Sequence, residues 1–286
     1  MKFKLAHVSD IHFFHLCKSP LQFFNGRFYG NFNYLFSRRK HFDQNQIFAL
    51  AQGLKKENIS SILISGDLTC TATDKELSTS KRMLEVLKEL GFTLYVLPGN
   101  HDVYTKRSFL KKDFYTRLEK QIDFTGDYSL NLIDHHVVGY KLPHNVHLVL
   151  LDLTKYNSFI DANGHFTSPI ERNFKHLLRE IDPTGSIILS AHFPYDTFKA
   201  PKAHLIDGDR LEALIKNDHR IKLYLHGHRH APRIETRETH LLIDSGSVSL
   251  KESSSYNLIE FDEEHFETTL YTNDRKVKNA VVRKRS

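Results

Sequence analysis

The pattern of apolar and polar positions divides the chain into strand-like and helix-like segments. Five short runs rich in Val, Ile and Leu have the length of buried strands. These runs cover residues 4–9, 61–65, 94–97, 186–191 and 221–226. Between them apolar residues recur every three or four positions, which predicts amphipathic helices. The helices are expected over residues 43–58, 73–91, 106–121, 168–181 and 209–217.

Shorter strands are expected in much of the remaining chain. Alternating segments separated by turn residues are expected to be antiparallel neighbours over 128–133, 135–142 and 146–152. After residue 230 four more strands are expected to form a meander. They cover residues 232–236, 240–245, 255–261 and 265–272. Strands and helices in this alternation indicate an α/β or α+β fold.

Each of the five buried runs is followed at once by residues of metal-binding type. The carboxyl ends of strands in an open sheet form one edge, so these side chains are expected to meet there. Imidazole and carboxylate together suit Zn, Fe, Ni or Mn, and two ions about 3.5–4 Å apart are a recurrent device for phosphoryl hydrolysis. The strand-end residues are Asp10, His12, Asp67, Asn100, His192, His228 and His230, with His101 as a further candidate.

The order of these motifs resembles that of the calcineurin-like metallophosphoesterases. The resemblance is carried by Asp-x-His at Asp10, Gly-Asp at Asp67, Gly-Asn-His-Asp from Gly99, a single His at His192 and Gly-His-x-His ending at His230. It implies an α+β fold in which two mixed β-sheets form a layered sandwich flanked by helices. It also implies one domain, which we expect over residues 1–272.

A narrower resemblance is to the class III cyclic-nucleotide phosphodiesterases. It is carried by Leu151-Asp152, by Gly164, by the helix over 168–181 and by His192-Phe193-Pro194. In that subgroup the last motif is usually His-His-Pro, and Phe193 stands in place of the second histidine. This resemblance favours a phosphodiester as the substrate.

The family resemblance implies a role for each strand-end residue. One metal ion would be bound by Asp10, His12 and His230, the other by Asn100, His192 and His228, and Asp67 would bridge them. A water molecule between the ions would become hydroxide near neutral pH and attack phosphorus.

The same resemblance implies a catalytic histidine beside the metal ligands. His101 would protonate the leaving group or bind a phosphoryl oxygen, and Asp102 would orient it. Arg229 lies between two ligands and is interpreted equally well as a phosphate contact or as a surface residue.

Composition places few further limits on function. The chain has 286 residues, a net charge of +6 and 40% hydrophobic residues, as expected of an ordinary soluble protein. Cys17 and Cys70 are too few for a disulfide framework, and no apolar run approaches the roughly 20 residues of a membrane-spanning helix. No signal peptide is recognised either. A cytoplasmic location is therefore expected, with peripheral contact with a membrane left open.

Two basic segments are not explained by the predicted fold and metal site. Residues 13–42 contain ten aromatic side chains and no acidic residue, and they resemble an insertion beside the site. The segment could be a packed loop, a lid or a membrane-facing wedge. Residues 273–286 are expected to be a basic tail, frayed by default, with contact to an anionic surface as the alternative.

These observations predict a binuclear-metal phosphoesterase that hydrolyses a phosphodiester, such as a cyclic or other small nucleotide. The cofactors are expected to be two divalent ions, Mn, Fe or Zn. Two alternatives stay open: a hydrolase of a lipid-linked pyrophosphate or phospholipid at a membrane surface, and a non-catalytic scaffold of the same fold. The predicted partners are a small phosphodiester and, through 13–42, an anionic lipid; a nucleic-acid partner is not expected, and the sequence leaves the oligomeric state open.

Overall fold

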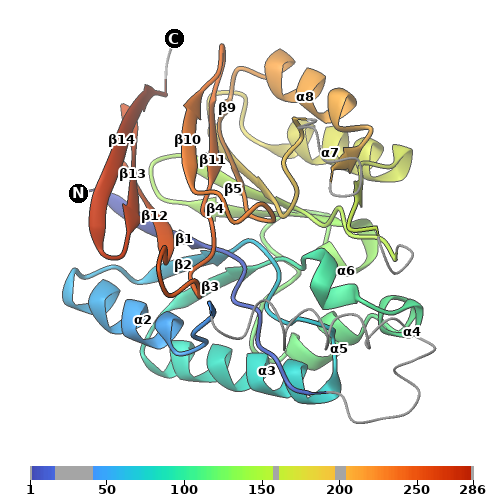
Figure 1. Cartoon of the computed structure of the whole chain (residues 1–286). Helices are drawn as coiled ribbons and strands as arrows, with labels where there is room; N and C mark the ends of the chain where they lie inside the picture. Colours follow the sequence, from blue (N-terminus) through green and yellow to red (C-terminus); the bar gives the residue numbers. More distant parts are fainter. Residues whose placement is uncertain (1, 17–40, 157–160, 197–203, 285–286) are drawn as a thin grey trace.

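Two six-stranded β-sheets form the centre of the molecule, and helices lie on the outer side of each (Figure 1). The computed structural model describes residues 2–16, 41–156, 161–196 and 204–284. The predicted α+β sandwich of two mixed sheets flanked by helices is confirmed.

The first sheet has the strand order β14-β13-β12-β1-β2-β3. Its strands are β1 (Phe3–Val8), β2 (Ser61–Ile64), β3 (Thr93–Val96), β12 (Ser255–Phe261), β13 (His265–Thr272) and β14 (Arg275–Arg283). The pairs β1–β2 and β2–β3 are parallel, so the carboxyl ends of these three strands lie at one edge.

The second sheet has the strand order β10-β11-β9-β7-β5-β4. Its strands are β4 (Val137–Leu142), β5 (Val146–Leu151), β7 (Ser186–Ala191), β9 (Ile221–His226), β10 (Arg233–Thr236) and β11 (Leu241–Asp244). The central strands β5, β7, β9 and β11 run parallel. Every residue of β5, β7 and β9 is buried, as expected for parallel strands covered on both sides. A separate pair is formed by β6 (Gly164–His165) and β8 (Leu205–Ile206).

The helices form the outer layers and parts of the connecting segments around the site (Figure 1). They are α2 (Gln46–Lys56), α3 (Asp74–Glu89), the 3-10 helix η3 (Asn100–Val103), α4 (Lys106–Leu110), α5 (Asp113–Leu118), α6 (Leu132–His135), α7 (Ser168–Glu180) and α8 (Gly208–Asn217). A capping box formed by Thr73 and Glu76 starts α3. None of the described helices is long and apolar enough to cross a membrane.

The hydrophobic core has two layers separated by the second sheet. Strand β5 shows how they divide: Leu148 and Leu150 pack into the layer between the sheets, whereas Val149 and Leu151 pack under the outer helices. Both faces of the strand are therefore apolar, and both sheets are held rigidly behind the edge where their parallel strands end.

Two of the predicted elements differ from the structure. The helix expected over 106–121 is two short helices, α4 and α5, interrupted where Lys112 adopts a positive φ of 52°. The strand expected over 128–133 does not form. Instead the Asn131 side chain accepts a hydrogen bond from Asp134 N at 2.8 Å and starts the short helix α6.

The C-terminal part of the chain also differs from the prediction. The expected meander is divided between the sheets, because β10 and β11 extend the second sheet whereas β12 and β13 extend the first. Residues 275–283 are strand β14, paired antiparallel with β13, and not a frayed tail. Ala280 and Val282 pack against the core and anchor this strand. Within the expected insertion at 13–42, residues 17–40 lie outside the described residues, and the domain boundaries stay a prediction.

Candidate metal centre

The carboxyl-end edges of the two sheets meet, and the strand-end residues gather where they do. His192 Nδ1, after β7, lies 2.8 Å from Ser65 O, after β2. The backbone N–H of His228, after β9, donates to Asp10 Oδ2, after β1, at 3.0 Å. Residues more than 100 positions apart in sequence are thus in direct contact across the two sheets.

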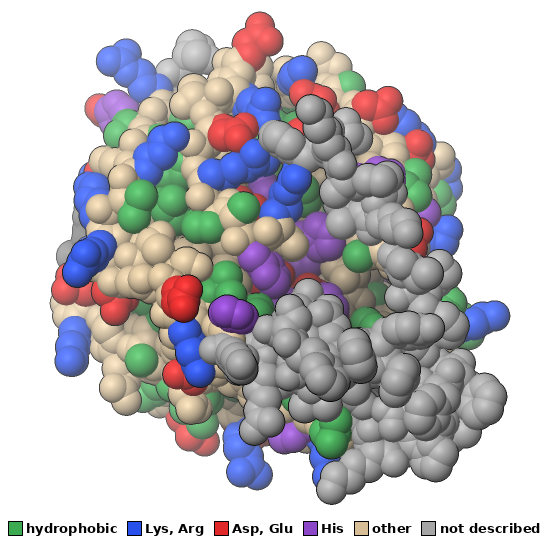
Figure 2. All heavy atoms as spheres, viewed as in Figure 1, with side chains coloured by type: hydrophobic (Ala, Val, Ile, Leu, Met, Phe, Trp, Pro, Cys, Tyr) green, Lys and Arg blue, Asp and Glu red, His purple; other side chains and the backbone are tan. Residues whose placement is uncertain are grey.

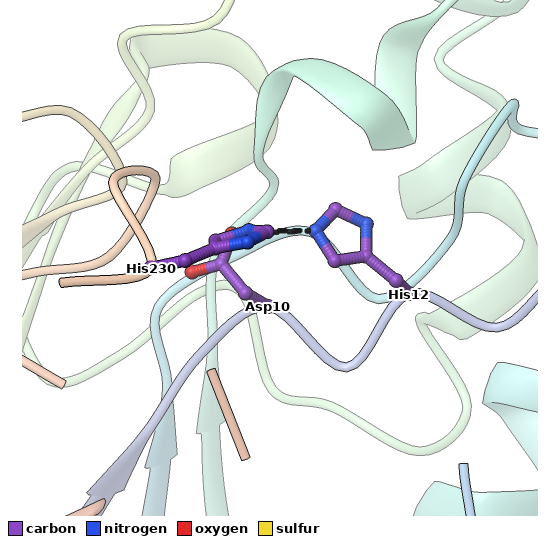
Figure 3. Close-up of side chains that lie close together, drawn as sticks. All are labelled: Asp10, His12 and His230. Carbon is purple, nitrogen blue, oxygen red and sulfur yellow. Dashed lines mark hydrogen bonds and ion pairs between the residues drawn. The ribbon is translucent and has the colours of Figure 1, made fainter. Parts of the chain in front are cut away.

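The first cluster consists of Asp10, His12 and His230 (Figure 3). His12 Nε2 and His230 Nε2 are 3.0 Å apart. Asp10 Oδ1 lies 3.0 Å from His230 Nε2 and 3.5 Å from His12 Nε2. Figure 3 shows the His230 ring directed toward the His12 ring, with the Asp10 carboxylate beside His230.

The second cluster consists of Asp67, His192 and His228. Asp67 Oδ2 lies 3.3 Å from His192 Nε2 and, on its other side, 3.8 Å from His12 Nε2. Asp67 is therefore placed between the clusters, as the predicted bridging ligand requires. Asn100 follows Gly99, which packs against Asp67, and Asn100 Oδ1 is buried with no hydrogen-bond partner among the described residues.

The spacing of these atoms fits metal ions. Two ligand atoms that bind one ion at about 2.1 Å lie roughly 3.0–3.5 Å apart in octahedral or tetrahedral geometry. The four distances of 3.0, 3.0, 3.5 and 3.3 Å fall in this window. Asn100 Oδ1 and His228 Nε2 are buried acceptor atoms without hydrogen-bond partners in the described structure, and such atoms are costly unless they bind something. The residues present therefore fit two divalent ions.

The backbone at the site is strained, which is common at functional sites. Positive φ angles between 53° and 72° occur at five of the strand-end residues. These are Asp10, His12, Asp67, His228 and His230.

Two glycines of the sequence motifs are required by close packing. A Cβ at Gly99 would overlap Asp67 Oδ1, and a Cβ at Gly227 would overlap Ser9 Oγ and Asp10 Oδ2. Any larger residue at either position would displace a carboxylate of the centre.

The two buried carboxylates of the site favour bound cations. Burial alone would raise the pKa of Asp10 and of Asp67, but the surrounding histidines outweigh it and hold both pKa values below the usual range. Burial alone would lower the pKa of His192, but the two carboxylates raise it to about 9. Burial, and then the charge of His192, lowers the pKa of His228 to about 3, so this imidazole is neutral, as metal binding requires.

His101 lies beside the ligands and is oriented by the backbone. A ring nitrogen of His101 is within 4.8 Å of the ligand atoms of His12 and Asp67. Its Nδ1 is 2.6 Å from Cys70 O, and because a carbonyl only accepts, Nδ1 carries the hydrogen. Tyr104 stacks on the ring with centroids 5.7 Å apart. Nε2 is then the nitrogen able to exchange a proton with a substrate.

The role predicted for Asp102 needs correction. Its carboxylate accepts hydrogen bonds from Leu68 N, Thr69 N, Thr69 Oγ1 and Gly99 N at 2.9–3.2 Å. Burial and the charge of Asp67 raise the pKa of Asp102 to about 7, whereas these donors favour the ionised form. Asp102 thus ties the loop after β2 to the loop after β3, and the carbonyl of Cys70 orients His101. A backbone carbonyl leaves no signal in the sequence.

The centre is partly open to solvent. Asp10, His12, Asp67 and His192 are at most 1% exposed, whereas Asn100, His101, His228 and His230 are partly exposed. Figure 2 shows histidine side chains near the middle of one face, with acidic atoms visible between them. A phosphate group would approach from this face.

The chain belongs to the calcineurin-like phosphoesterase family, whose model matches residues 3–232. This membership confirms the family resemblance and the predicted enzyme class, a metal-dependent phosphoester hydrolase. Members of the family typically bind two divalent ions. No curated protein matches the sequence of this chain at a significant level.

Solved structures share the fold at low sequence identity. A dimetal phosphatase from Danio rerio aligns with a TM-score of 0.70 at 13% identity, covering 98% of each chain. Purple acid phosphatase PPD1 from yellow lupin (Lupinus luteus) has a TM-score of 0.62 at 10% identity, covering 99% of this chain and 54% of that one. GAP50 of Plasmodium, an anchor in the inner membrane complex, has a TM-score of 0.56 at 11% identity, covering 99% and 89%.

Proposed function

We propose that this chain hydrolyses a phosphodiester of a small nucleotide at a centre of two divalent metal ions. The observation that supports the proposal most strongly is that Asp67 of the second cluster also lies near the first, with its Oδ2 3.8 Å from His12 Nε2, and that His101 lies beside both residues. The narrower sequence resemblance over residues 151–194 favours a diester over a monoester. When bound, two such ions reduce the negative charge that repels a nucleophile from phosphate and lower the pKa of a water molecule.

The two clusters would hold the ions as the sequence predicts. Asp10, His12 and His230 form one side of the centre, and His192 and His228 form the other. Asn100 would add its buried Oδ1 to the second side. Manganese, iron and zinc all suit these oxygen and nitrogen ligands.

His101 would supply the proton that the leaving group needs. An alkoxide from a ribose is a poor leaving group unless it is protonated as the bond to phosphorus breaks. With Nδ1 held by the carbonyl of Cys70, Nε2 of the imidazolium can donate to the leaving oxygen. Arg229, in the loop between His228 and His230, would neutralise charge on the phosphate.

Two substrates with different leaving groups test this proposal. Metal-stripped protein is supplied with Mn²⁺ and assayed with bis(p-nitrophenyl) phosphate and with a 3′,5′-cyclic mononucleotide. The variant is His101→Gln, and His265→Gln on β13 is the matched control. We expect Mn²⁺-dependent turnover of both substrates, with loss of about 10²–10⁴-fold in His101→Gln for the cyclic nucleotide. The loss should be smaller for the nitrophenyl ester, whose leaving group departs without a proton.

Other outcomes contradict parts of the proposal. Equal losses on both substrates would mean that His101 binds the phosphoryl oxygen and does not donate a proton. Turnover confined to a phospholipid or lipid pyrophosphate presented in anionic vesicles would favour the membrane alternative, which the aromatic and basic composition of 13–42 suggests. No turnover of any of these substrates, with Mn²⁺, Fe²⁺ or Zn²⁺, would favour a scaffold.

A further inference from the structure

Each half of the metal centre packs against one phenylalanine. The Phe42 ring lies 5.5 Å from the His12 ring and 5.9 Å from the His230 ring, measured between centroids. The Phe193 ring lies 5.1 Å from the His192 ring and 4.9 Å from the His228 ring. All four contacts are tilted or edge-on, with interplanar angles of 57–82°. This is the arrangement that aromatic rings prefer.

Phe42 is fixed where the chain returns to the site. It is 7% exposed. The next residue, Asp43, donates its N–H to Ser249 O at 2.7 Å, and Gln44 Nε2 donates to His12 O at 3.3 Å. The chain on the C-terminal side of Phe42 is therefore held by hydrogen bonds to the segment after β11 and to the backbone of His12, one of the proposed metal ligands.

Phe193 is fixed equally firmly on the opposite side. It is fully buried, and its carbonyl accepts a hydrogen bond from the Tyr224 hydroxyl at 2.7 Å. A Cβ at Gly164 would lie 2.5 Å from the Phe193 ring, so the β6 backbone packs directly against this ring. The ring has no room to move away from His192 and His228.

An apolar ring packed against two imidazoles changes what those imidazoles can do. It removes ring orientations that point away from the ion, so less conformational entropy is lost when the ion binds. It also excludes water from one side of the ligands, which lowers the local dielectric constant. Both effects act before any substrate is present, and both act on one pair of histidines only.

We propose that Phe42 and Phe193 are positioning residues, each of which sets the metal affinity of one half of the centre. Phe42 acts on the half formed by Asp10, His12 and His230, and Phe193 acts on the half that contains His192 and His228. The inference rests on the proposed two-metal centre. It adds that the metal affinities of the two halves are set separately.

Calorimetric titration of metal-stripped protein with Mn²⁺ tests this inference without any substrate. The variants are Phe42→Leu and Phe193→Leu. Phe174→Leu is the matched control, because Phe174 is a fully buried residue of α7 in the core layer that also contains Phe193. We expect two ions per wild-type chain, and about tenfold weaker binding of one ion in each site variant, the size of effect seen when residues behind metal ligands change. The control should bind both ions as the wild type does.

A second set of variants identifies which ion is affected. In a His228→Ala background, which disables the second half, Phe42→Leu should weaken the remaining ion and Phe193→Leu should not. In a His12→Ala background the pattern should reverse. Far-UV circular dichroism without metal checks folding, and Phe193→Met replaces Phe193→Leu if the latter does not fold.

The failure of this inference is distinct from failure of the proposed function. Two ions that bind with wild-type affinity in both phenylalanine variants would overturn the positioning role. So would a parallel loss of both ions in each single variant. A wild-type chain that binds fewer than two ions would instead overturn the metal centre on which the proposed function depends.

Discussion

Replacing Asp102 with asparagine separates two roles that its carboxylate can have. Asparagine has the same shape but one carbonyl oxygen. At least two of the four donors from Leu68, Thr69 and Gly99 therefore lose their acceptor and face an amide NH₂ group. A buried donor without a partner costs about 1–3 kcal/mol. The free energy of unfolding should fall by about 2–6 kcal/mol, a large part of the stability of a typical domain.

The assay is urea unfolding of metal-stripped protein followed by far-UV circular dichroism, so that metal binding does not contribute to stability. His101→Gln is measured beside Asp102→Asn. The His101 ring donates a hydrogen bond to the carbonyl of Cys70, and losing it should cost only about 1 kcal/mol. The reasoning is refuted if Asp102→Asn costs no more than His101→Gln while hydrolysis falls to the same level in both. Asp102 would then act through the imidazole after all.

Three further predictions concern residues around the centre. Gly99→Ala should lower hydrolysis about a hundredfold, because its Cβ displaces the Asp67 carboxylate; near-normal turnover would contradict this packing. Glu76→Ala should lower the free energy of unfolding by about 3 kcal/mol in urea, since three backbone N–H groups lose their acceptor; a loss below about 1 kcal/mol would count against it. The hydrogen bond between Asp152 and His136 raises the pKa of His136 and, against the effect of burial, lowers that of Asp152. The contribution of His136 to stability is complete below its unfolded pKa of about 6.5, and it is lost as the pH rises through the higher pKa of the folded state. The contribution of Asp152 is lost only as the pH falls through its own lowered pKa. The stability difference between wild type and Asp152→Asn should therefore be larger at pH 5 than at pH 9, and equal differences in urea titrations would contradict the pairing.

The sequence predicted best those features that local chemistry determines. Parallel strands such as β7 and β9 are buried on both faces and rich in Ile and Leu, so their ends are easy to locate. The polar residues after them are poor core material. Once the strands are parallel, His192 and His228 must lie at one edge of their sheet. The two clusters were therefore predictable as a group, although the binding and catalytic roles of the individual residues stay predictions.

Features that depend on tertiary contacts were missed. Phe42 packs on His12, from which 29 residues separate it in the chain, and one aromatic residue in an aromatic-rich segment carries no sign of this contact. Strand β14 contains four Lys or Arg residues, and its apolar residues do not alternate regularly with polar ones. Its pairing with β13 supplies the stability that its own pattern does not indicate. The partner of His101 is a backbone carbonyl, which any residue at position 70 would provide.

The central claim is that the strand-end residues form one centre for two metal ions, joined by Asp67. The most direct test is to count the Mn²⁺ ions bound per chain by wild-type protein and by Asp67→Ala after metal stripping, reloading and removal of free metal. We expect two ions in the wild type and at most one, weakly held, in Asp67→Ala, because both halves lose a ligand. Two tightly bound ions in Asp67→Ala, or none in the wild type, would contradict the claim.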